Sequence, residues 1–190
     1  MDHQNSPPVV PSLARSIATG AIGFGLVSLR VFATVAFAER WMYQTLGLAG
    51  AYLAWTLLFI LLSGAVFGSL VVVRWRLPRF YFLFGLAFFA YAAGWTIAYF
   101  TLRNGAGEWL GSLAGSVLMA LVFAAGFGAL PSTLKLSAVL FVSNSLGYFI
   151  GSALNNSVGG RPGMLLWGVA DGLFFGAGIG AVLHRVQQHQ

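Results

Sequence analysis

Residues 164–183 read MLLWGVADGLFFGAGIGAVL, and this stretch decides the fold class. Its 20 residues include a single charged side chain, Asp171. An α-helix rises about 1.5 Å per residue, so about 20 residues cross the ~30 Å hydrocarbon core of a bilayer. Glycine recurs at every fourth position from residue 168 to residue 180, a spacing typical of closely packed membrane helices. The stretch predicts a transmembrane helix.

Five more apolar blocks precede this one, separated by turns that carry glycine, proline or charge. Each block is about twice as long as a transmembrane β-strand and is apolar on every side, which favours helices. The sequence therefore predicts an all-α polytopic membrane protein, a bundle of six transmembrane helices within residues 16–184. We expect a flexible tail at residues 1–15 and a short one at 185–190. The helices are expected at residues 17–38, 45–73, 80–102, 109–130, 134–154 and 164–183.

The composition argues against a water-soluble globule. The chain has 190 residues, of which 58% are hydrophobic and only 7% are charged, whereas soluble domains carry about a quarter charged residues. The net charge is +6, but the basic side chains lie at the ends of the apolar blocks, as membrane topology requires. We therefore expect a lipid bilayer as the surrounding medium and no nucleic acid as a partner.

The basic residues also predict an orientation, because loops rich in Lys and Arg stay in the cytoplasm. One side of the predicted bundle, which includes both termini, carries twice as many Lys and Arg residues as the other. The richer side holds Arg15, Arg74, Arg76, Arg79, Lys135 and Arg185, and the poorer side holds Arg40, Arg103 and Arg161. We expect both termini in the cytoplasm and the protein in the bacterial cytoplasmic (inner) membrane.

Small residues predict how the helices pack. Ridges of Gly, Ala and Ser let helix backbones approach closely inside lipid. The last block carries the ridge Gly168, Gly172, Gly176 and Gly180, and the fifth block carries Gly147 and Gly151. We interpret these glycines as helix-packing positions; the alternative is that they line a pore or a sliding surface.

Two charged residues lie well inside the apolar blocks, Arg30 and Asp171. Intramembrane charges usually face the bundle interior and have a partner. Counted at 1.5 Å per residue, Arg30 lies about 13 Å and Asp171 about 10 Å from the outer ends of their helices. We hypothesise an ion pair between them, either a structural latch or part of a solute or proton site. Asn144, in the middle of the fifth block, either lines a small cavity or hydrogen-bonds a neighbouring helix.

The sequence offers little chemistry for catalysis. It has no cysteine, and its histidines, His3, His184 and His189, are expected in or beside the tails. Nucleophile, zinc-protease and phosphate-loop motifs are absent from it. We therefore predict no metal site, no cofactor and no enzymatic activity.

Two functions remain open. The first is a small membrane transporter or channel component that binds a small-molecule solute within the bundle. The second is a non-catalytic structural or assembly subunit of a larger respiratory or photosynthetic membrane complex, with other membrane subunits or a second copy of the chain as partners. A phenylalanine-rich stretch of the third block offers such partners, or lipid, an aromatic surface: Phe80, Phe82, Phe84, Phe88 and Phe89.

In size and topology alone, the chain is similar to the membrane-embedded substrate-binding subunits of energy-coupling-factor vitamin importers. Those subunits carry an Ala-x-x-x-Ala docking face on the first helix, and Ala14 and Ala18 have that spacing here. The spacing is common in apolar helices, so it assigns no family.

Overall fold

The computed structural model describes residues 9–72 and 77–188, and these residues are helical apart from short turns. All five long helices are long and apolar enough to cross a membrane. The all-α class predicted from the sequence is therefore confirmed, and the five long apolar helices support the predicted multi-pass character. In chain order the elements are α1 (Leu13–Gly68), α2 (Leu77–Leu102), α3 (Gly105–Gly126), the 3-10 turn η1 (Leu130–Ser132), α4 (Thr133–Val158) and α5 (Gly160–Gln187).

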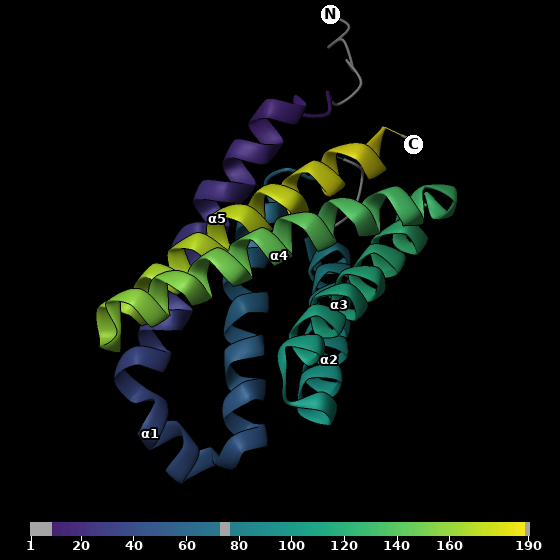
Figure 1. Ribbon diagram of the computed structural model, residues 1–190. Helices are drawn as coiled ribbons and strands as arrows, with labels where there is room; N and C mark the ends of the chain where they lie inside the picture. The colour runs from purple at the N-terminus through teal and green to yellow at the C-terminus, as the bar shows by residue number, and fades with distance from the viewer. Residues whose placement is uncertain (1–8, 73–76, 189–190) are drawn as a thin grey trace, which may run out of the picture.

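The longest helix, α1, folds back on itself at Gly47, whose backbone leaves the helical region with φ 68° and ψ 177°. The rings of Phe24 and Phe67 lie 5.8 Å apart, although 43 residues of straight helix would separate them by about 65 Å. We call residues 13–46 the first arm of α1 and residues 48–68 its second arm. Figure 1 shows the two arms joined at the end of the molecule opposite to the chain termini.

The structure therefore has five long helices where the sequence predicted six. The helices expected at residues 17–38 and 45–73 are the two arms of α1, and the break expected at Glu39 and Arg40 is helical. Residues 39–46 contain neither glycine nor proline, and a charged pair does not interrupt helical hydrogen bonds. Gly47 ends the first arm because only glycine adopts such a positive φ readily.

Other predicted boundaries also shift. Residues 13–15 and 185–187, expected in the tails, belong to α1 and α5. The turn expected between the last two blocks shrinks to Gly159, with φ 73°, because the polar residues before it continue α4. The second arm ends at Gly68, and residues 73–76, which include Arg74 and Arg76 of the orientation argument, lie outside the described residues, as do residues 1–8 and 189–190.

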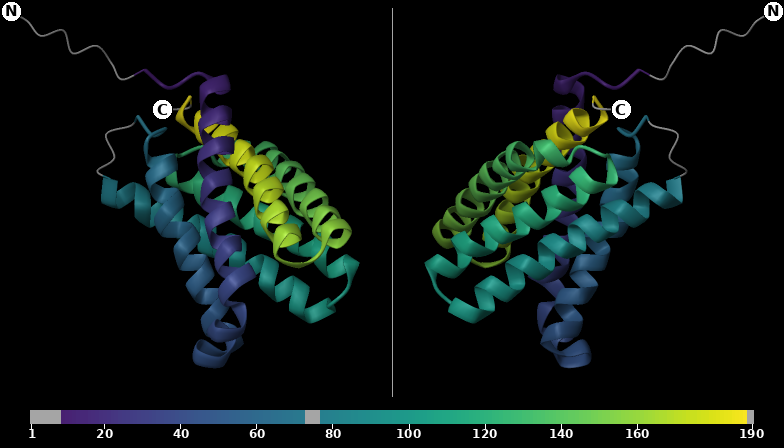
Figure 2. Two further views of the ribbon diagram at one scale, coloured as in Figure 1. Left: turned by 90° about the vertical axis from the view of Figure 1, so that its left-hand side faces the viewer. Right: turned by 90° about the vertical axis from the view of Figure 1, so that its right-hand side faces the viewer.

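The helices form two groups, which meet where α3 packs against α4 and, less extensively, where α1 packs against α2. α5 packs between the first arm of α1 and α4, while α2 pairs with α3 (Figures 1 and 2). The described ends of the chain meet, since Nδ1 of His184 lies 2.8 Å from the carbonyl oxygen of Pro11. Gly47, the α2–α3 turn and the α4–α5 turn lie on the opposite side of the molecule (Figures 1 and 2), which we call the hairpin end.

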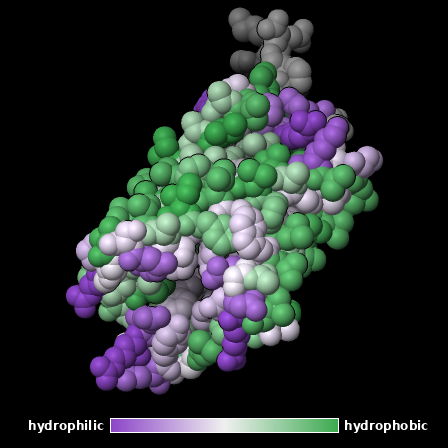
Figure 3. All heavy atoms as spheres, in the orientation of Figure 1, coloured by the Kyte–Doolittle hydropathy of each residue, from purple (hydrophilic) through white to green (hydrophobic). Residues whose placement is uncertain are grey.

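The surface of the bundle is suited to lipid. Large apolar side chains are exposed on every long helix, with Phe82 at 75% and Ile97 at 68% among the most exposed on α2. Figure 3 shows a largely hydrophobic middle on this face, with the hydrophilic residues gathered toward its two ends. A water-soluble protein rarely exposes apolar surface so continuously, whereas a transmembrane bundle must.

The predicted glycine ridge lies between α5 and the first arm of α1. A Cβ atom on Gly176 would overlap the carbonyl oxygen of Gly20, and one on Gly172 would lie 2.8 Å from Cα of Gly25. Gly168 faces the side chain of Phe32 in the same way. Gly180 likewise approaches the backbone of Ser16. We call Gly168, Gly172, Gly176 and Gly180 the glycine face of α5.

The glycines of α4 approach α5 from its other side. A Cβ atom on Gly147 would lie 2.9 Å from Cα of Asp171, and one on Gly151 would lie 3.0 Å from the carbonyl oxygen of Trp167. α5 is thus in backbone contact with α1 and with α4 at the height of Asp171, which leaves its side chains few directions in which to point.

Candidate functional site: an aromatic cavity

A cavity of about 360 Å³ lies between α1, α2, α4 and α5. Thirteen of its 21 lining residues are aromatic, and none is Lys, Arg or His. The remaining lining residues include two acids, Asp171 and Glu39. The aromatic lining residues are Phe24, Phe32, Tyr43, Tyr52, Trp55, Phe59, Phe88, Tyr91, Trp95, Tyr99, Tyr148, Trp167 and Phe175.

Helical periodicity brings these side chains together. α2 lines the cavity with residues 88, 91, 92, 95, 96 and 99, which repeat at three- and four-residue intervals and so share one face. Met164, Trp167, Asp171 and Phe175 form the corresponding cavity face of α5. On its other side, Gly94 of α2 approaches the backbone of Gly115 in α3. α2 therefore packs closely on one face and carries large rings into the cavity on the other.

The cavity is closed toward the chain termini. Phe24, Phe88 and Phe175, each at least 96% buried, form its floor. The ring of Phe24 contacts that of Phe175 at 5.8 Å and that of Phe88 at 6.1 Å. Toward the hairpin end the lining includes Glu39, whose side chain is exposed, and Tyr43, whose hydroxyl group lies near Glu39. We call these two residues the mouth, because the cavity reaches the surface there.

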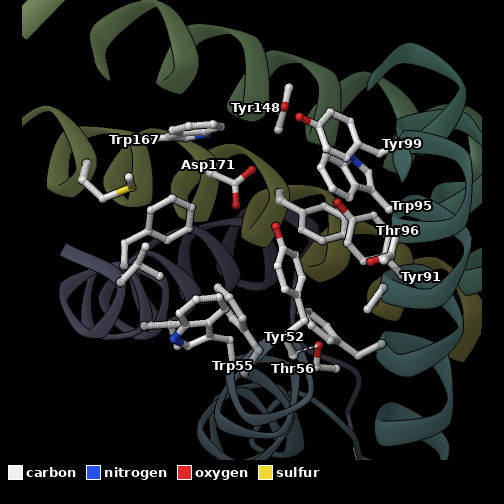
Figure 4. Close-up of a pocket in the computed structure, with 18 of the residues that line it drawn as sticks. Tyr52, Trp55, Thr56, Tyr91, Trp95, Thr96, Tyr99, Tyr148, Trp167 and Asp171 are labelled. Atoms are coloured by element: carbon white, nitrogen blue, oxygen red, sulfur yellow. Dashed lines mark hydrogen bonds between the residues drawn. The ribbon is translucent and has the colours of Figure 1, made fainter. Parts of the chain in front are cut away.

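Asp171 is the acid inside the cavity. It lies eleven residues into α5, about 16 Å along the helix from Gly160. Its side chain points into the cavity, among the rings of Trp167, Tyr148 and Tyr52 (Figure 4). Among residues 9–72 and 77–188, no side chain forms a hydrogen bond or ion pair with its carboxyl group. The protein therefore holds an acid in an aromatic cavity without supplying a partner for it.

The structure does not bring Arg30 and Asp171 together. Arg30 is exposed on the first arm of α1, and no ion pair joins it to any described residue. The reason is rotational: Ser28 faces α5 at Gly172, and Arg30 follows two residues later, about 200° around the helix. The ion-pair hypothesis compared depths in the membrane, and depth does not fix the direction in which a side chain points.

Asn144 joins three helices. Its Oδ1 accepts a 2.6 Å hydrogen bond from the hydroxyl of Tyr91 in α2, and its Nδ2 donates one of 2.7 Å to Oγ of Ser112 in α3. Ser112 in turn shares a 2.8 Å hydrogen bond with Ser145 of α4. Asn144 does not itself line the cavity. It accepts a hydrogen bond from Tyr91, which lines the cavity. Of the two roles predicted for Asn144, the structure therefore shows hydrogen bonds to neighbouring helices.

The basic residues of the hairpin end, Arg40, Arg103 and Arg161, do not line the cavity, and two of them lie against rings elsewhere. The guanidinium of Arg161 lies 4.8 Å from the ring centroid of Phe37, and that of Arg103 lies 5.9 Å from the centroid of Phe100. Neither ring lines the cavity. The cavity lining consequently offers one carboxyl group in the interior and one at the mouth, and no basic side chain beside either of them in the lining.

Sequence reasoning missed most of the cavity. Neither Trp167 nor Tyr43 was among the residues predicted for a site, and both line the cavity. Of the phenylalanine-rich stretch, Phe88 lines the cavity, while Phe82 and Phe89 are exposed. The signal was present in α2, where Phe88, Tyr91, Trp95 and Tyr99 repeat at helical spacing. A run of aromatic residues on one helix face predicts either a lipid-facing or a buried surface, and a single sequence does not distinguish the two.

The search for known relatives assigned no identity. No protein-family model, curated protein or solved structure matches the chain. In the part of the chain that the structure describes, no group of three or more His, Asp or Glu side chains is placed to hold a metal ion. The chemistry that the cavity walls offer is that of ring faces, hydroxyl groups and carboxyl groups.

Proposed function

We propose that this chain is a small membrane transporter or channel component that binds a small solute in the aromatic cavity. The observation that carries the proposal is the cavity itself, with an aromatic floor at one end, an exposed mouth at the other and an acid between them. Its volume of about 360 Å³ lies within the ~300–1,000 Å³ range of small-molecule sites. Mostly apolar walls with a few polar groups are also typical of such sites.

Binding rather than catalysis is proposed because of the residue types in the walls. The lining residues include no His, Ser, Cys or Lys. An acyl- or group-transfer site needs a nucleophile with an adjacent base, and neither threonine of the walls, Thr56 or Thr96, forms a hydrogen bond with Asp171 or Glu39.

The proposal includes a topology. The arms of α1 measure about 50 Å and 32 Å, so each is long enough to cross the bilayer. Together with α2, α3, α4 and α5 they make six crossings. The excess of Lys and Arg predicted on the side of the two termini assigns the hairpin end to the outside of the bacterial cytoplasmic membrane. The mouth therefore faces away from the cytoplasm. The aromatic floor then separates a bound solute from the cytoplasmic side.

Cysteine labelling tests this topology directly, because the natural chain contains no cysteine. Gln44 is exposed at the hairpin end and Ser69 is exposed at the other end. A membrane-impermeant maleimide should label Gln44→Cys in intact cells and should label Ser69→Cys only after the cells are permeabilised. The reverse pattern would contradict the proposed sidedness, and labelling of both in intact cells would contradict the six crossings.

Native mass spectrometry tests solute binding. We expect protein purified in mild detergent to retain a small molecule, and Ala92→Phe to abolish retention because Ala92 lines the cavity. Ile97→Phe is the matched control, since Ile97 lies on the exposed face of the same helix. Equal retention by both variants would contradict binding in the cavity. A stoichiometric co-purifying membrane complex, with no retained solute, would favour the alternative function as a structural subunit.

A further inference from the structure

We infer that the solute is a small organic cation, held in the cavity by the carboxyl group of Asp171 and by the faces of the surrounding aromatic rings. The inference rests on the proposed function, and it adds the charge and chemical class of the solute. Three features of the cavity carry it: its charge, its rings and its volume.

The charge of the cavity calls for a positive occupant. Asp171 and Glu39 line it, and no basic residue does. A carboxylate at membrane depth requires a partner. The carboxyl group of Asp171 points into the cavity (Figure 4), and none of the described side chains forms a hydrogen bond or ion pair with it. Arg30, the nearest candidate by depth, faces away. We therefore assign the solute as the partner of the Asp171 carboxyl group.

The rings specify what kind of cation fits. A cation over an aromatic face is attracted by the electrons of the ring, most strongly over tryptophan. Trp167 and Tyr148 lie close to Asp171, and Trp55 and Tyr52 lie across the cavity from it (Figure 4). The rings of Tyr148 and Trp167 contact each other at 5.4 Å. An occupant among them meets ring faces on several sides and a carboxyl group at one point.

Metal ions and sugars do not fit these walls. Ca²⁺ and Mg²⁺ need six or more oxygen ligands, and the cavity presents one carboxyl group at depth among rings. A neutral sugar finds ring faces and tyrosine hydroxyl groups here, but it carries no positive charge to pair with the carboxyl group of Asp171. The cavity volume of about 360 Å³ lies at the lower end of the range for ligand sites. An organic cation of one or two rings, or a compact quaternary ammonium, satisfies all three features.

Three probes of equal shape and different charge test the inference. N-methylquinolinium is a cation, 2-methylquinoline is neutral at mildly alkaline pH, and quinoline-2-carboxylate is an anion. Isothermal titration of the purified full-length protein in a non-ionic detergent should give the cation at least about tenfold tighter binding than the neutral probe, and no measurable binding of the anion. Ala92→Phe should abolish binding of the cation, and Ile97→Phe should preserve it.

Substitution of Asp171 is the second test of the inference. Asp171→Asn should weaken cation binding by at least about tenfold and change binding of 2-methylquinoline less than twofold. Asn156→Ala is the control, because Asn156 is exposed at the same end of the bundle and does not line the cavity; it should bind the cation as the wild type does. The probe comparison on the wild type alone decides the inference if Asp171→Asn does not fold.

The outcomes separate the two proposals. If the neutral or anionic probe binds in the cavity at least as tightly as the cation, or if Asp171→Asn binds the cation normally, the cation inference is wrong and solute binding stands. If Ala92→Phe still binds the cation, the site lies outside the cavity and the inference is wrong. If no probe binds and native mass spectrometry finds no retained solute, both proposals are overturned.

Discussion

The first arm of α1 meets α5 and α2 in opposite ways. Against α5 it packs backbone to backbone, because the glycine face has no side chains to hold the helices apart. Toward α2 the rings of Phe24 and Phe88 contact each other at 6.1 Å, and beyond these rings the helices enclose the cavity. Lipid offers no hydrophobic effect to drive helices together, so packing of small residues stabilises the first contact. Large rigid rings prevent the same closeness in the second.

One helix contributes to both regions. The glycine face of α5 contacts α1, and its cavity face presents Trp167, Asp171 and Phe175. Gly172 follows Asp171 directly, so the two point about 100° apart around the helix. A closely packed contact thus fixes the position of the acid that the cavity uses. The closely packed α1–α5 contact and the aromatic cavity therefore depend on the same helix, and each can be tested separately.

The largest effect is expected at the glycine face. Gly172→Leu would place a side chain where Cα of Gly25 lies 2.8 Å from the added Cβ, and neither backbone can move without separating the helices. We expect no stably folded protein, measured by fluorescence-detected size exclusion after mild extraction. Gly105→Leu is the control, because nothing lies within 4 Å of its Cβ position. Well-folded Gly172→Leu protein with altered solute transport would instead favour a sliding surface at this contact.

A smaller loss is expected in the hydrogen-bond network beside the cavity. Asn144→Ala removes the acceptor of Tyr91 and the donor to Ser112, both in buried surroundings. Unpaired buried polar groups cost about 1–3 kcal/mol each, and interhelical hydrogen bonds in membranes average about 0.6 kcal/mol. We expect a total loss of about 1–3 kcal/mol in the free energy of unfolding, measured in mixed detergent micelles. Tyr91→Phe should lose less than Asn144→Ala, and the opposite order would show that Asn144 does not join the helices.

An effect of similar or smaller size is expected where α1 reverses. Gly47 has φ 68° and no neighbouring atom within 4 Å of an added Cβ. Gly47→Ala therefore tests backbone strain alone, which costs about 1–3 kcal/mol for a non-glycine residue in such a conformation. The same unfolding measurement should show a loss in this range, with solute binding preserved. An unchanged stability would indicate that the two arms are joined in another way.

The sequence predicted what depends on composition and helical spacing. Block lengths indicated the transmembrane helices, and the four-residue spacing of glycines on α5 indicated which face is densely packed. It predicted a reversal between the first two blocks but placed it at Glu39 and Arg40 and not at Gly47, because the charged pair is the more conspicuous break. It singled out Asp171 but assigned Arg30 as its partner, since the rotation of one helix against another depends on contacts such as Ser28 with Gly172. The cavity depends on several helices together, so no single block could reveal it.

The smallest effect is expected at the mouth, and it distinguishes the mouth from the interior. Glu39 is exposed, so water and salt screen its charge, whereas Asp171 acts among aromatic rings where screening is weak. Glu39→Gln should leave the free energy of unfolding within about 0.5 kcal/mol and weaken binding of N-methylquinolinium by about two- to threefold, an effect that disappears in high salt. Isothermal titration at two salt concentrations measures both. A loss as large as that of Asp171→Asn, and insensitive to salt, would move the principal charge contact from the interior to the mouth. The dense contact of α5 with α1 would then no longer position the charge that recognises the solute, because Glu39 belongs to α1 and owes its place to the hairpin at Gly47.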